Sequence, residues 1–291
     1  MRKAVVLLMV LAVIGLAVPC FAGSESMTLY DDFNKKAINA FKWTGQENES
    51  DSNHRVIREA VRQIEGQQLH LGVCAKATCT DCGNTDVKYG QNRLKVRTTN
   101  TFTALKATVK VNAVTLVGGT LNATPPAARA RVYGFFFNDG TSTGQTDSTG
   151  DVYAYISLGK ASDSATASNR VNIEGYVNRC KEASCVSTEP VSSSPVSLGT
   201  VPIGQPVTLY VEWDKAGHKF IFQKIKGQTI KDTEEISYAG ILNDTAAPVN
   251  ASNYRLDVIG VVPNDTTVPG SLKAIPAAAI DANFDDVYFN N

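Results

Sequence analysis

Apolar and polar residues alternate along most of this chain, and the clearest alternation lies between Gln205 and Lys224. Its apolar members occupy every second position: Val207, Leu209, Val211 and Trp213. In a β-strand this spacing places all four on one face and the intervening residues on the other. Residues 214–217 then supply turn-forming residues, after which Phe220 and Phe222 resume the alternation. The segment predicts a β-hairpin.

The same alternation predicts further short strands, which polar turns separate. We expect them at residues 28–33, 94–97, 104–117, 130–138, 152–158, 171–178, 254–262 and 284–289. The separators at residues 140–150, 185–199 and 263–276 are rich in Gly, Ser, Thr or Pro. After the first strand we expect a loop, which carries Trp43 and a polar run from Gln46 to Asn53.

One segment has two interpretations. Residues 56–64 show apolar side chains at helical spacing, whereas residues 61–71 fit two strands joined at Glu65 and Gly66. We favour the strands, because no other part of the chain supports a helical layer. Many short strands without a long helix predict an all-β fold, an antiparallel β-sandwich.

The first 22 residues have the three parts of a secretory signal peptide. Arg2 and Lys3 precede an apolar run from Ala4 to Val18, and a polar stretch follows Ala22. We expect cleavage after Ala22 and a secreted or extracytoplasmic protein, whether periplasmic, on the cell surface or extracellular. The apolar run is too short, and its downstream flank too polar, for a transmembrane anchor. We therefore expect no membrane insertion after cleavage.

Charge and size narrow the class of protein further. The chain has 28 Lys and Arg against 28 Asp and Glu, without a basic or acidic block. This pattern does not favour binding to nucleic acid or to an anionic membrane. Residues 23–291 suffice for one large β-sandwich, and their composition shows no break that would favour two domains.

Cysteine usage agrees with export. Of the six cysteines, Cys20 would leave with the signal peptide, so an odd number would remain. In an oxidising compartment we expect local disulfide bonds, namely Cys180 with Cys185, and Cys74 with either Cys79 or Cys82. The spacing C-x4-C-x2-C over residues 74–82, with a distant fourth cysteine, also fits one iron–sulfur pattern. The signal lacks the twin-arginine motif that would export a folded cluster protein, which favours the disulfides.

Four patterns together resemble the concanavalin A-like lectin/glucanase superfamily. They are Asp31-Asp32-Phe33 followed by Trp43, the hairpin that ends in Q-L-H-L at residues 68–71, the central V-T-L-Y-V-E-W-D at residues 207–214, and the closing F-D-D-V-Y at residues 284–288. The resemblance spans nearly all of residues 23–291. It implies a jelly-roll sandwich in which the first and last strands lie side by side and a curved sheet offers a concave outer face.

Two catalytic motifs are incomplete. Glucanases of this superfamily place their carboxylates in E-x-D-x-x-E. Here Glu212 and Asp214 match, but Gly217 stands where the second glutamate belongs. Residues 140–144 satisfy G-x-S-x-G, yet no helix follows them and the three histidines, His54, His70 and His218, are scattered. We therefore expect no catalytic residues at either motif.

A set of outward-facing polar and aromatic residues is the candidate binding site. Alternation leaves the following residues opposite the apolar sets of their strands: Tyr153, Tyr155, Asn172, Glu174, Tyr176 and Tyr210. If the three strands are neighbours, one outer face presents tyrosines among amides and carboxylates. Sugars bind by stacking on aromatic rings and by hydrogen bonds to planar groups, so this face suits a glycan or polysaccharide. Alternatively, the tyrosines only pair across strands on a solvated sheet.

Four aspartates near the chain ends suggest a structural calcium ion. Asp31, Asp32, Asp285 and Asp286 would converge if the terminal strands pair, and calcium prefers oxygen ligands. Turn formation and protection of sheet edges are the alternative roles of these residues. We expect no other cofactor.

The leading hypothesis from the sequence is a secreted, lectin-like, non-catalytic β-sandwich that binds carbohydrate. A structural or adhesive surface protein is one alternative, and a polysaccharide hydrolase or lyase is another.

Overall fold

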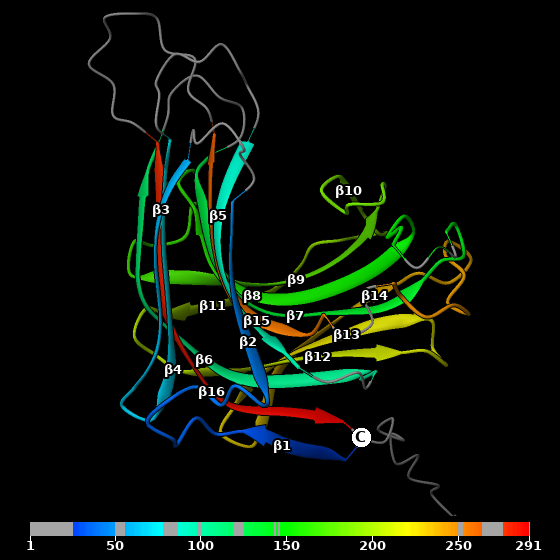
Figure 1. Cartoon of the computed structure of the whole chain (residues 1–291), viewed down its shortest axis with the longest axis horizontal. Coiled ribbons are helices and arrows are strands. Elements are labelled where there is room, and N and C mark those ends of the chain that lie inside the picture. Colours follow the sequence, from blue (N-terminus) through cyan, green and yellow to red (C-terminus); the bar gives the residue numbers. More distant parts are fainter. Residues whose placement is uncertain are drawn as a thin grey trace, which may run out of the picture.

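The computed structural model describes residues 26–49, 56–77, 87–97, 101–118, 125–142, 144, 146–249, 253–263 and 276–290. All regular secondary structure in these ranges is β-strand (Figure 1). The strands form two antiparallel sheets, which we call sheet A and sheet B. The predicted all-β antiparallel sandwich is therefore confirmed. The predicted signal peptide, together with Cys79 and Cys82, lies outside the described residues.

Sheet A has the strand order β14-β13-β12-β6-β16-β4-β3, and β1 also pairs with β16. Its strands are β1 (Met27–Asp31), β3 (Val56–Glu65), β4 (Gln68–Ala77), β6 (Ala104–Val117), β12 (Val207–Asp214), β13 (Lys219–Lys226), β14 (Thr229–Ser237) and β16 (Ala277–Asn290). The first and last strands lie side by side, as the resemblance to the concanavalin A-like superfamily implies.

Sheet B has the order β10-β9-β8-β7-β15-β5-β2, and β11 also pairs with β9. Its strands are β2 (Trp43–Glu49), β5 (Val87–Val96), β7 (Ala127–Asn138), β8 (Asp151–Ala161), β9 (Arg170–Cys180), β10 (Thr188–Pro190), β11 (Val196–Pro202) and β15 (Arg255–Pro263). Within the described ranges, no helix is long and apolar enough to cross a membrane.

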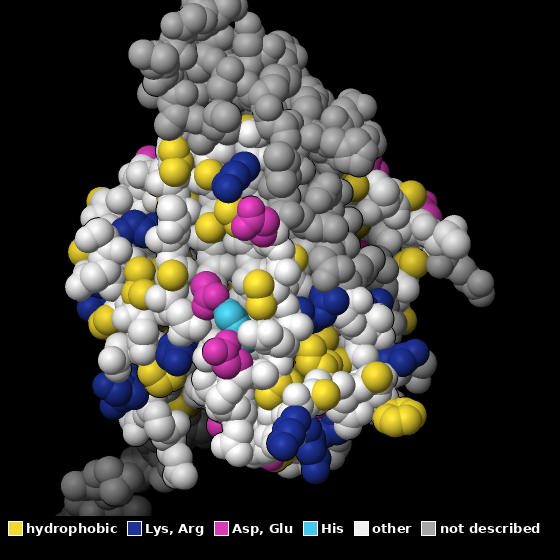
Figure 2. Space-filling model, turned by 60° about the vertical axis from the view of Figure 1, so that its left-hand side comes forward, with side chains coloured by type: hydrophobic (Ala, Val, Ile, Leu, Met, Phe, Trp, Pro, Cys, Tyr) yellow, Lys and Arg dark blue, Asp and Glu magenta, His cyan; other side chains and the backbone are white. Residues whose placement is uncertain are grey.

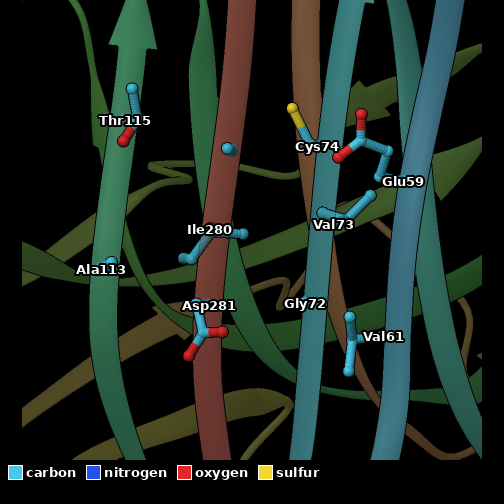
Figure 3. A pocket seen from close by; sticks show the side chains of 10 residues that line it. Glu59, Val61, Gly72, Val73, Cys74, Ala113, Thr115, Ile280 and Asp281 are labelled. Carbon is cyan, nitrogen blue, oxygen red and sulfur yellow. The ribbon is translucent and has the colours of Figure 1, made fainter.

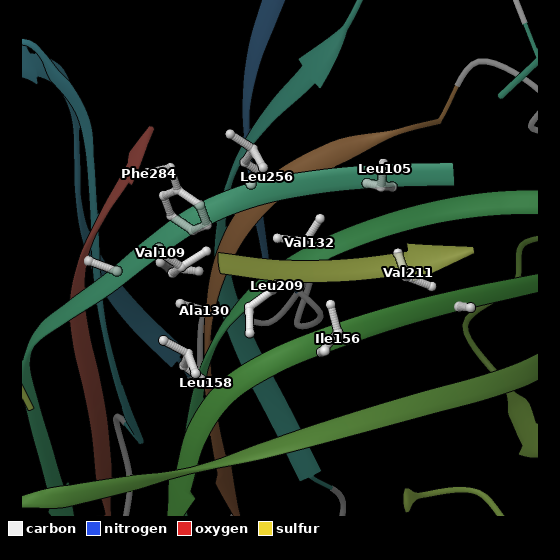
Figure 4. Packing of buried hydrophobic residues seen from close by; sticks show 14 of the residues in the cluster. Leu105, Val109, Ala130, Val132, Ile156, Leu158, Leu209, Val211, Leu256 and Phe284 are labelled. Carbon is white, nitrogen blue, oxygen red and sulfur yellow. The ribbon is translucent and has the colours of Figure 1, made fainter. Parts of the chain in front are cut away.

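The core lies between the sheets and is built from alternate residues of their strands. Figure 4 shows Leu105 and Leu209 of sheet A near Val132 and Ile156 of sheet B. The predicted central hairpin is confirmed, since β12 and β13 pair with Val211 opposite Phe222. These strands form because each buries one apolar face against the other sheet.

One glycine is required by the approach of the two sheets. Gly175 of β9 faces the core, and a Cβ atom at this position would lie 2.5 Å from Cγ of Phe222 in β13. The Phe222 ring is fully buried. A residue without a side chain at position 175 therefore lets this ring pack close against β9.

Both sheets are strongly bent, and sheet B lies on the inside of the bend (Figure 1). Two strand pairs of the bent sheets have an irregular register: the pairing of β16 with β6 shifts, and so does the pairing of β7 with β8. Such β-bulges increase local twist and curvature. As a result, the face of sheet B that points away from the core lines the concave side of the bent molecule. The face of sheet A that points away from the core lines the convex side, which we call the back of the molecule.

The ambiguous segment at residues 56–71 is a hairpin, as we predicted. It forms β3 and β4, with Gly66 and Gln67 at φ angles of 57° and 62° in the connecting turn. Two positive φ angles are typical of the tight turns that match strand twist.

The loop expected around Trp43 was wrong in part, because residues 43–49 form β2 and pair with β5. Three other strands were missed as well, namely β14 and the short strands β10 and β11. All four lie at or near a sheet edge, where backbone hydrogen bonds rather than an apolar face hold a strand. The alternation that identified the central strands is therefore weak in them.

Candidate functional site

The strand register arranges the outward side chains of sheet B in rows on the inside of the bend (Figure 1). The tyrosine row contains Lys95, Arg255, Tyr133, Tyr155 and Tyr176. The charged row contains Arg93, Asp257, Arg131, Ser157 and Glu174. The Arg129 row contains Gln91, Ile259, Arg129, Gly159 and Asn172. A shorter row contains Phe135, Tyr153 and Asn178. We call these four rows the tyrosine–arginine face.

The rings of the tyrosine row stack on one another across the strands. Tyr155 lies between Tyr176, at a centroid distance of 4.7 Å, and Tyr133, at 5.8 Å, with interplanar angles of 14° and 11°. The other face of Tyr133 meets the Arg255 guanidinium, 3.7 Å from the ring centroid. Side chains stand upright on a sheet, so stacked rings point their hydroxyl ends outward. The row therefore presents polar edges rather than open ring faces.

This packing changes the predicted mode of sugar binding. Tyr153 and Tyr155 are only 9% and 8% exposed, and Tyr153 stacks on Tyr133 at 5.0 Å. Tyr153 and Tyr155 lie on one face of the sheet, as alternation predicted. However, the neighbours of Tyr155 and Tyr133 cover both faces of each ring, so a sugar has no ring face there to stack on. Contacts with a ligand at these two residues must come from hydroxyl groups.

A buried ion cluster lies beside the tyrosine row. Arg131 donates to both oxygens of Asp257, from Nε to Oδ1 at 2.7 Å and from Nη2 to Oδ2 at 2.9 Å. Arg255 Nε and Gln91 Nε2 donate to the same Oδ2, at 2.9 and 2.6 Å. Burial alone would raise the pKa of the Asp257 carboxyl, but the two arginines lower it below its usual value. Asp257 is therefore an ionised anchor for two guanidinium groups.

A second chain of hydrogen bonds runs along the side of the face next to β9. Arg129 Nη2 donates to Tyr176 Oη at 3.3 Å, and this hydroxyl donates to Glu174 Oε2 at 2.6 Å. Burial, and secondarily the bond to Glu174, raises the pKa of Tyr176 to about 12 against the opposing effect of Arg129. Tyr176 is half-buried and stays a neutral donor at physiological pH.

Two further cations lie on the side of the face next to β5. Burial, reinforced by repulsion from Arg255, lowers the pKa of Arg93 to about 10. Burial, together with Arg255 and Arg93, also lowers the pKa of Lys95. Within the described residues, Arg93 Nε is buried without a hydrogen-bond partner.

The predicted Cys180–Cys185 disulfide is present and closes the connection between β9 and β10. Both cysteines pack against the aromatic residues of the face, in a cluster with Tyr153 and Tyr155. The bond therefore fixes the edge of sheet B beside the candidate site.

The predicted bond of Cys74 is wrong, because Cys74 is a free thiol. β4 stays extended through Ala77, which carries the chain about 10 Å beyond Cys74 at 3.3 Å per residue. Cys74 is thus a thiol within an extended strand.

Tyr210 does not belong to the site. Its strand β12 lies in sheet A, between β13 and β6, so Tyr210 points to the back of the molecule and not to the tyrosine–arginine face. Its hydroxyl donates to Glu212 Oε2 at 2.5 Å, and Asp214 Oδ1 accepts from the Gly217 amide at 2.8 Å in the turn. The incomplete glucanase motif therefore has structural roles here.

The aspartates near the chain ends accept hydrogen bonds from groups of the protein itself. The terminal strands pair as predicted, but Asp31 accepts from the Trp43 indole at 2.7 Å and from the Phe33 amide at 3.0 Å. Asp32 accepts from the Asn34 amide. Across the described ranges, no group of three or more His, Cys, Asp or Glu could hold a metal ion. A structural calcium ion stays a prediction that this geometry does not support.

The back of the molecule offers a second feature, a hollow of about 210 Å³ on sheet A (Figure 3). Its lining includes small residues, Gly72, Ala113 and Ala279, with the Cys74 thiol at one side. Next to it, a histidine lies between two acidic side chains (Figure 2). This is His70, whose Nδ1 and Nε2 contact Glu65 at 2.9 Å and Asp281 at 2.5 Å. These polar groups are already paired with one another.

Sequence reasoning missed the residues contributed by β7 and β15 to the face. Arg129, Arg131, Tyr133 and Phe135 occupy every second position of β7, and Arg255 and Asp257 do so in β15. The alternation test that found Tyr153 and Tyr155 would have found these residues in the same way.

Comparisons with known proteins give matches in structure alone. The sequence matches no protein-family model and no curated protein. One similar structure is a non-specific endo-β-1,3(4)-glucanase of family GH16, with 12% identity, a TM-score of 0.41, and coverage of 91% of this chain and 96% of that one. Another is LamA from Z. galactanivorans in complex with laminaritriose and laminaritetraose, with 12% identity, a TM-score of 0.38 and coverage of 89% and 96%. A third is a family 16 glycosyl hydrolase from Mycobacterium smegmatis, with 11% identity, a TM-score of 0.38, and coverage of 90% of this chain and 100% of that one. The likeness concerns the overall fold and assigns no role to any residue of this chain.

Proposed function

We propose that this chain is a secreted, non-catalytic protein that binds a polysaccharide at the tyrosine–arginine face. The observation that carries the proposal is the arrangement of hydroxyl, guanidinium, amide and carboxylate groups in register on the inside of the bend. Carbohydrates offer many hydroxyl groups, which rigidly placed planar donors and acceptors recognise. A bent sheet lets several strands contact the same extended ligand.

The side of the face next to β9 supplies the donors and acceptors for sugar hydroxyls. Tyr176 is half-buried and is fixed by Arg129 and Glu174. Asn172 is also half-buried, and its side-chain oxygen accepts from Thr166 at 2.5 Å. Groups that are already held in place lose little conformational entropy on binding. This side of the face is therefore preorganised for hydrogen bonding.

Hydrolysis of a polysaccharide, the activity that the names of the similar structures give to those proteins, is the second candidate. The face carries two carboxylates, Asp257 and Glu174, the residue type that glycoside hydrolysis uses. One of the pair must be a general acid with a raised pKa. Asp257 is unsuited, because it is fully buried, accepts four hydrogen bonds and has a lowered pKa. Binding without hydrolysis therefore fits this geometry better.

A pair of matched tyrosine variants tests the binding site. Tyr176→Phe removes a hydroxyl bonded to Glu174 on the proposed face, and Tyr210→Phe removes a hydroxyl bonded to Glu212 on the back of the molecule. In a screen of immobilised polysaccharides, we expect Tyr176→Phe to weaken binding about fivefold or more, the effect of about 1 kcal/mol per hydrogen bond. Tyr210→Phe should bind like the wild type.

The same screen separates the candidate functions. Equal binding by both variants would place the ligand elsewhere on the molecule. Binding to no polysaccharide would contradict the proposed function and favour an adhesive or structural role. A reducing-sugar assay on the polysaccharides that bind should give no product, whereas release of reducing ends would support a hydrolase.

A further inference from the structure

We propose that the polysaccharide bound at the tyrosine–arginine face is acidic, carrying uronate or sulfate groups that contact Arg93 and Lys95. This inference rests on the proposed function and names the class of its ligand. It follows from the balance of charge among the described side chains of the face, from two of these cations that form no ion pair with its carboxylates, and from the packing of the tyrosine rings.

The described side chains of the face carry an excess of positive charge. The cations are Arg93, Lys95, Arg129, Arg131 and Arg255, and the anions are Asp257 and Glu174. The whole chain has no such excess, since its 28 Lys and Arg balance 28 Asp and Glu. The charge on this face is therefore local, and it attracts anions to the inside of the bend.

Among the described side chains of the face, both carboxylates are bound to groups other than Arg93 and Lys95. Asp257 is occupied by Arg131 and Arg255. Glu174 lies at the far end of the charged row, where it accepts from Tyr176. Neither Arg93 nor Lys95 has an ion pair with them. An anionic group of a ligand would supply the missing charge.

Repulsion from neighbouring cations acts on both Arg93 and Lys95, and at Arg93 the Asp257 carboxylate offsets only part of it. Arg93 and Lys95 occupy alternate positions of β5 and therefore point to the same side of the sheet, where Arg255 of β15 lies opposite Lys95. Behind the dominant effect of burial, Arg255 and Arg93 contribute to the lowered pKa of Lys95, and Arg255 to that of Arg93. Arg93 Nε also lacks a partner within the described residues. A carboxylate or sulfate of a ligand beside the Arg93 and Lys95 head groups would offset this repulsion.

The packing of the tyrosine row decides which class of polyanion fits. Nucleic acids bind such surfaces by stacking bases on open aromatic faces. Here both ring faces of Tyr155 are covered by tyrosines, and Tyr133 lies between Tyr155 and Arg255. The half-buried Tyr176 hydroxyl at the end of the row suits the hydroxyl groups of a sugar chain, and the cations on the same face suit its acid groups. An acidic polysaccharide meets both requirements.

Calorimetric titration with a matched set of polymers tests the inference. Polygalacturonate and its methyl ester share one backbone and differ in charge. Alginate supplies a second uronate polymer, and chondroitin sulfate supplies a polymer with sulfate groups. Laminarin is a neutral β-glucan. A single-stranded DNA oligonucleotide controls for unspecific polyanion binding. We expect at least one acidic polysaccharide to bind at least tenfold more tightly than laminarin, the methyl ester and the DNA, with affinity that falls as NaCl is added.

Charge variants on β5 locate the contact. Lys95→Gln and Arg93→Gln should each weaken binding of the acidic polymer about tenfold, the effect of losing one charge-assisted hydrogen bond. Lys95→Arg keeps the charge and should restore most of the affinity. Lys110→Gln removes a half-buried cation from β6 on the back of the molecule and should have no effect. Thermal unfolding of each variant shows whether the fold is intact.

The outcomes separate this inference from the proposed function. Binding of laminarin or the methyl ester as tight as that of the acidic polymers, lost in Tyr176→Phe but not in Lys95→Gln, would overturn the acidic class and keep the proposed function. Binding of acidic polymers unchanged in Lys95→Gln and Arg93→Gln would overturn the contact, and equal binding of DNA would overturn the class. Absence of binding to every polysaccharide would contradict both.

Discussion

The Asp257 carboxylate lies between the guanidinium groups of Arg131 and Arg255 and is fully buried. Asp257→Asn keeps the shape of the side chain but leaves two buried cations without a counter-ion. Removing one partner from a buried ion pair costs about 3–5 kcal/mol. We therefore expect a decrease of this size in the free energy of unfolding at pH 7, measured by urea denaturation.

The control for this variant is Asp163→Asn, at an exposed position between β8 and β9. A surface substitution of this type should change stability by less than about 0.5 kcal/mol. Equal stabilities of Asp257→Asn and wild type would mean that the buried cluster does not depend on the negative charge of Asp257.

The same residue makes a prediction about pH. Because folding lowers the pKa of Asp257, its ionised form contributes stability above the pKa of an unfolded aspartate, which is about 4. That contribution is lost as the pH falls through the still lower pKa of the folded state. Asparagine does not titrate, so the stability difference between wild type and Asp257→Asn should shrink below about pH 4. Urea midpoints for both proteins between pH 7 and pH 2.5 measure this, and a constant difference over that range would contradict it.

Packing between strands of the two sheets makes the next prediction, at the contact of β9 with β13. Gly175→Ala places a methyl group 2.5 Å from the Phe222 ring, and overpacking of this kind costs about 1–3 kcal/mol. Phe222→Leu in the same chain should relieve the clash, so a double-mutant cycle should show coupling between the two positions.

Gly118→Ala is the matched control, because its added methyl group would meet no atom closer than 3.8 Å. It should change the free energy of unfolding by less than about 0.5 kcal/mol. Additive effects of Gly175→Ala and Phe222→Leu would show that the two side chains do not compete for the same space.

Strands were predictable from the sequence to the extent that each buries an apolar face. The β6 bounds match the prediction at both ends, and the inward residues of β8 and β9 are those that alternation selected. Alternation assigns a residue to a face of its own strand but carries no information about the neighbouring strand. Tyr210 shows the consequence, since it has the pattern of Tyr155 and Tyr176 but belongs to the other sheet.

At the scale of the molecule, the bend decides which face could be a site, and no local pattern encodes it. Bulges between β7 and β8 and between β6 and β16 accompany the curvature, and each depends on the register between two strands, which the pattern within one strand does not contain. For the same reason, the ion cluster around Asp257 could not be foreseen. It unites Gln91, Arg131 and Arg255 from three strands, and only the order of strands in sheet B brings them together.

The predicted single domain for residues 23–291 can be tested through the two tryptophans. Trp43 is buried at the start of β2 and bonded to Asp31, and Trp213 is at the end of β12 and bonded to Tyr238. Both contact one hydrophobic core that includes residues of both sheets. If the shared core unfolds cooperatively, the surroundings of Trp43 and of Trp213 unfold in the same transition.

Trp43→Phe and Trp213→Phe each leave one fluorescent reporter, and circular dichroism of the same sample measures the loss of the sheets. In each variant, the fluorescence and circular dichroism midpoints in urea should coincide. A fluorescence midpoint that precedes the loss of the sheets in one variant would mean that this end of the sandwich unfolds separately, and the tyrosine–arginine face would then have to be assigned to the unit that remains folded.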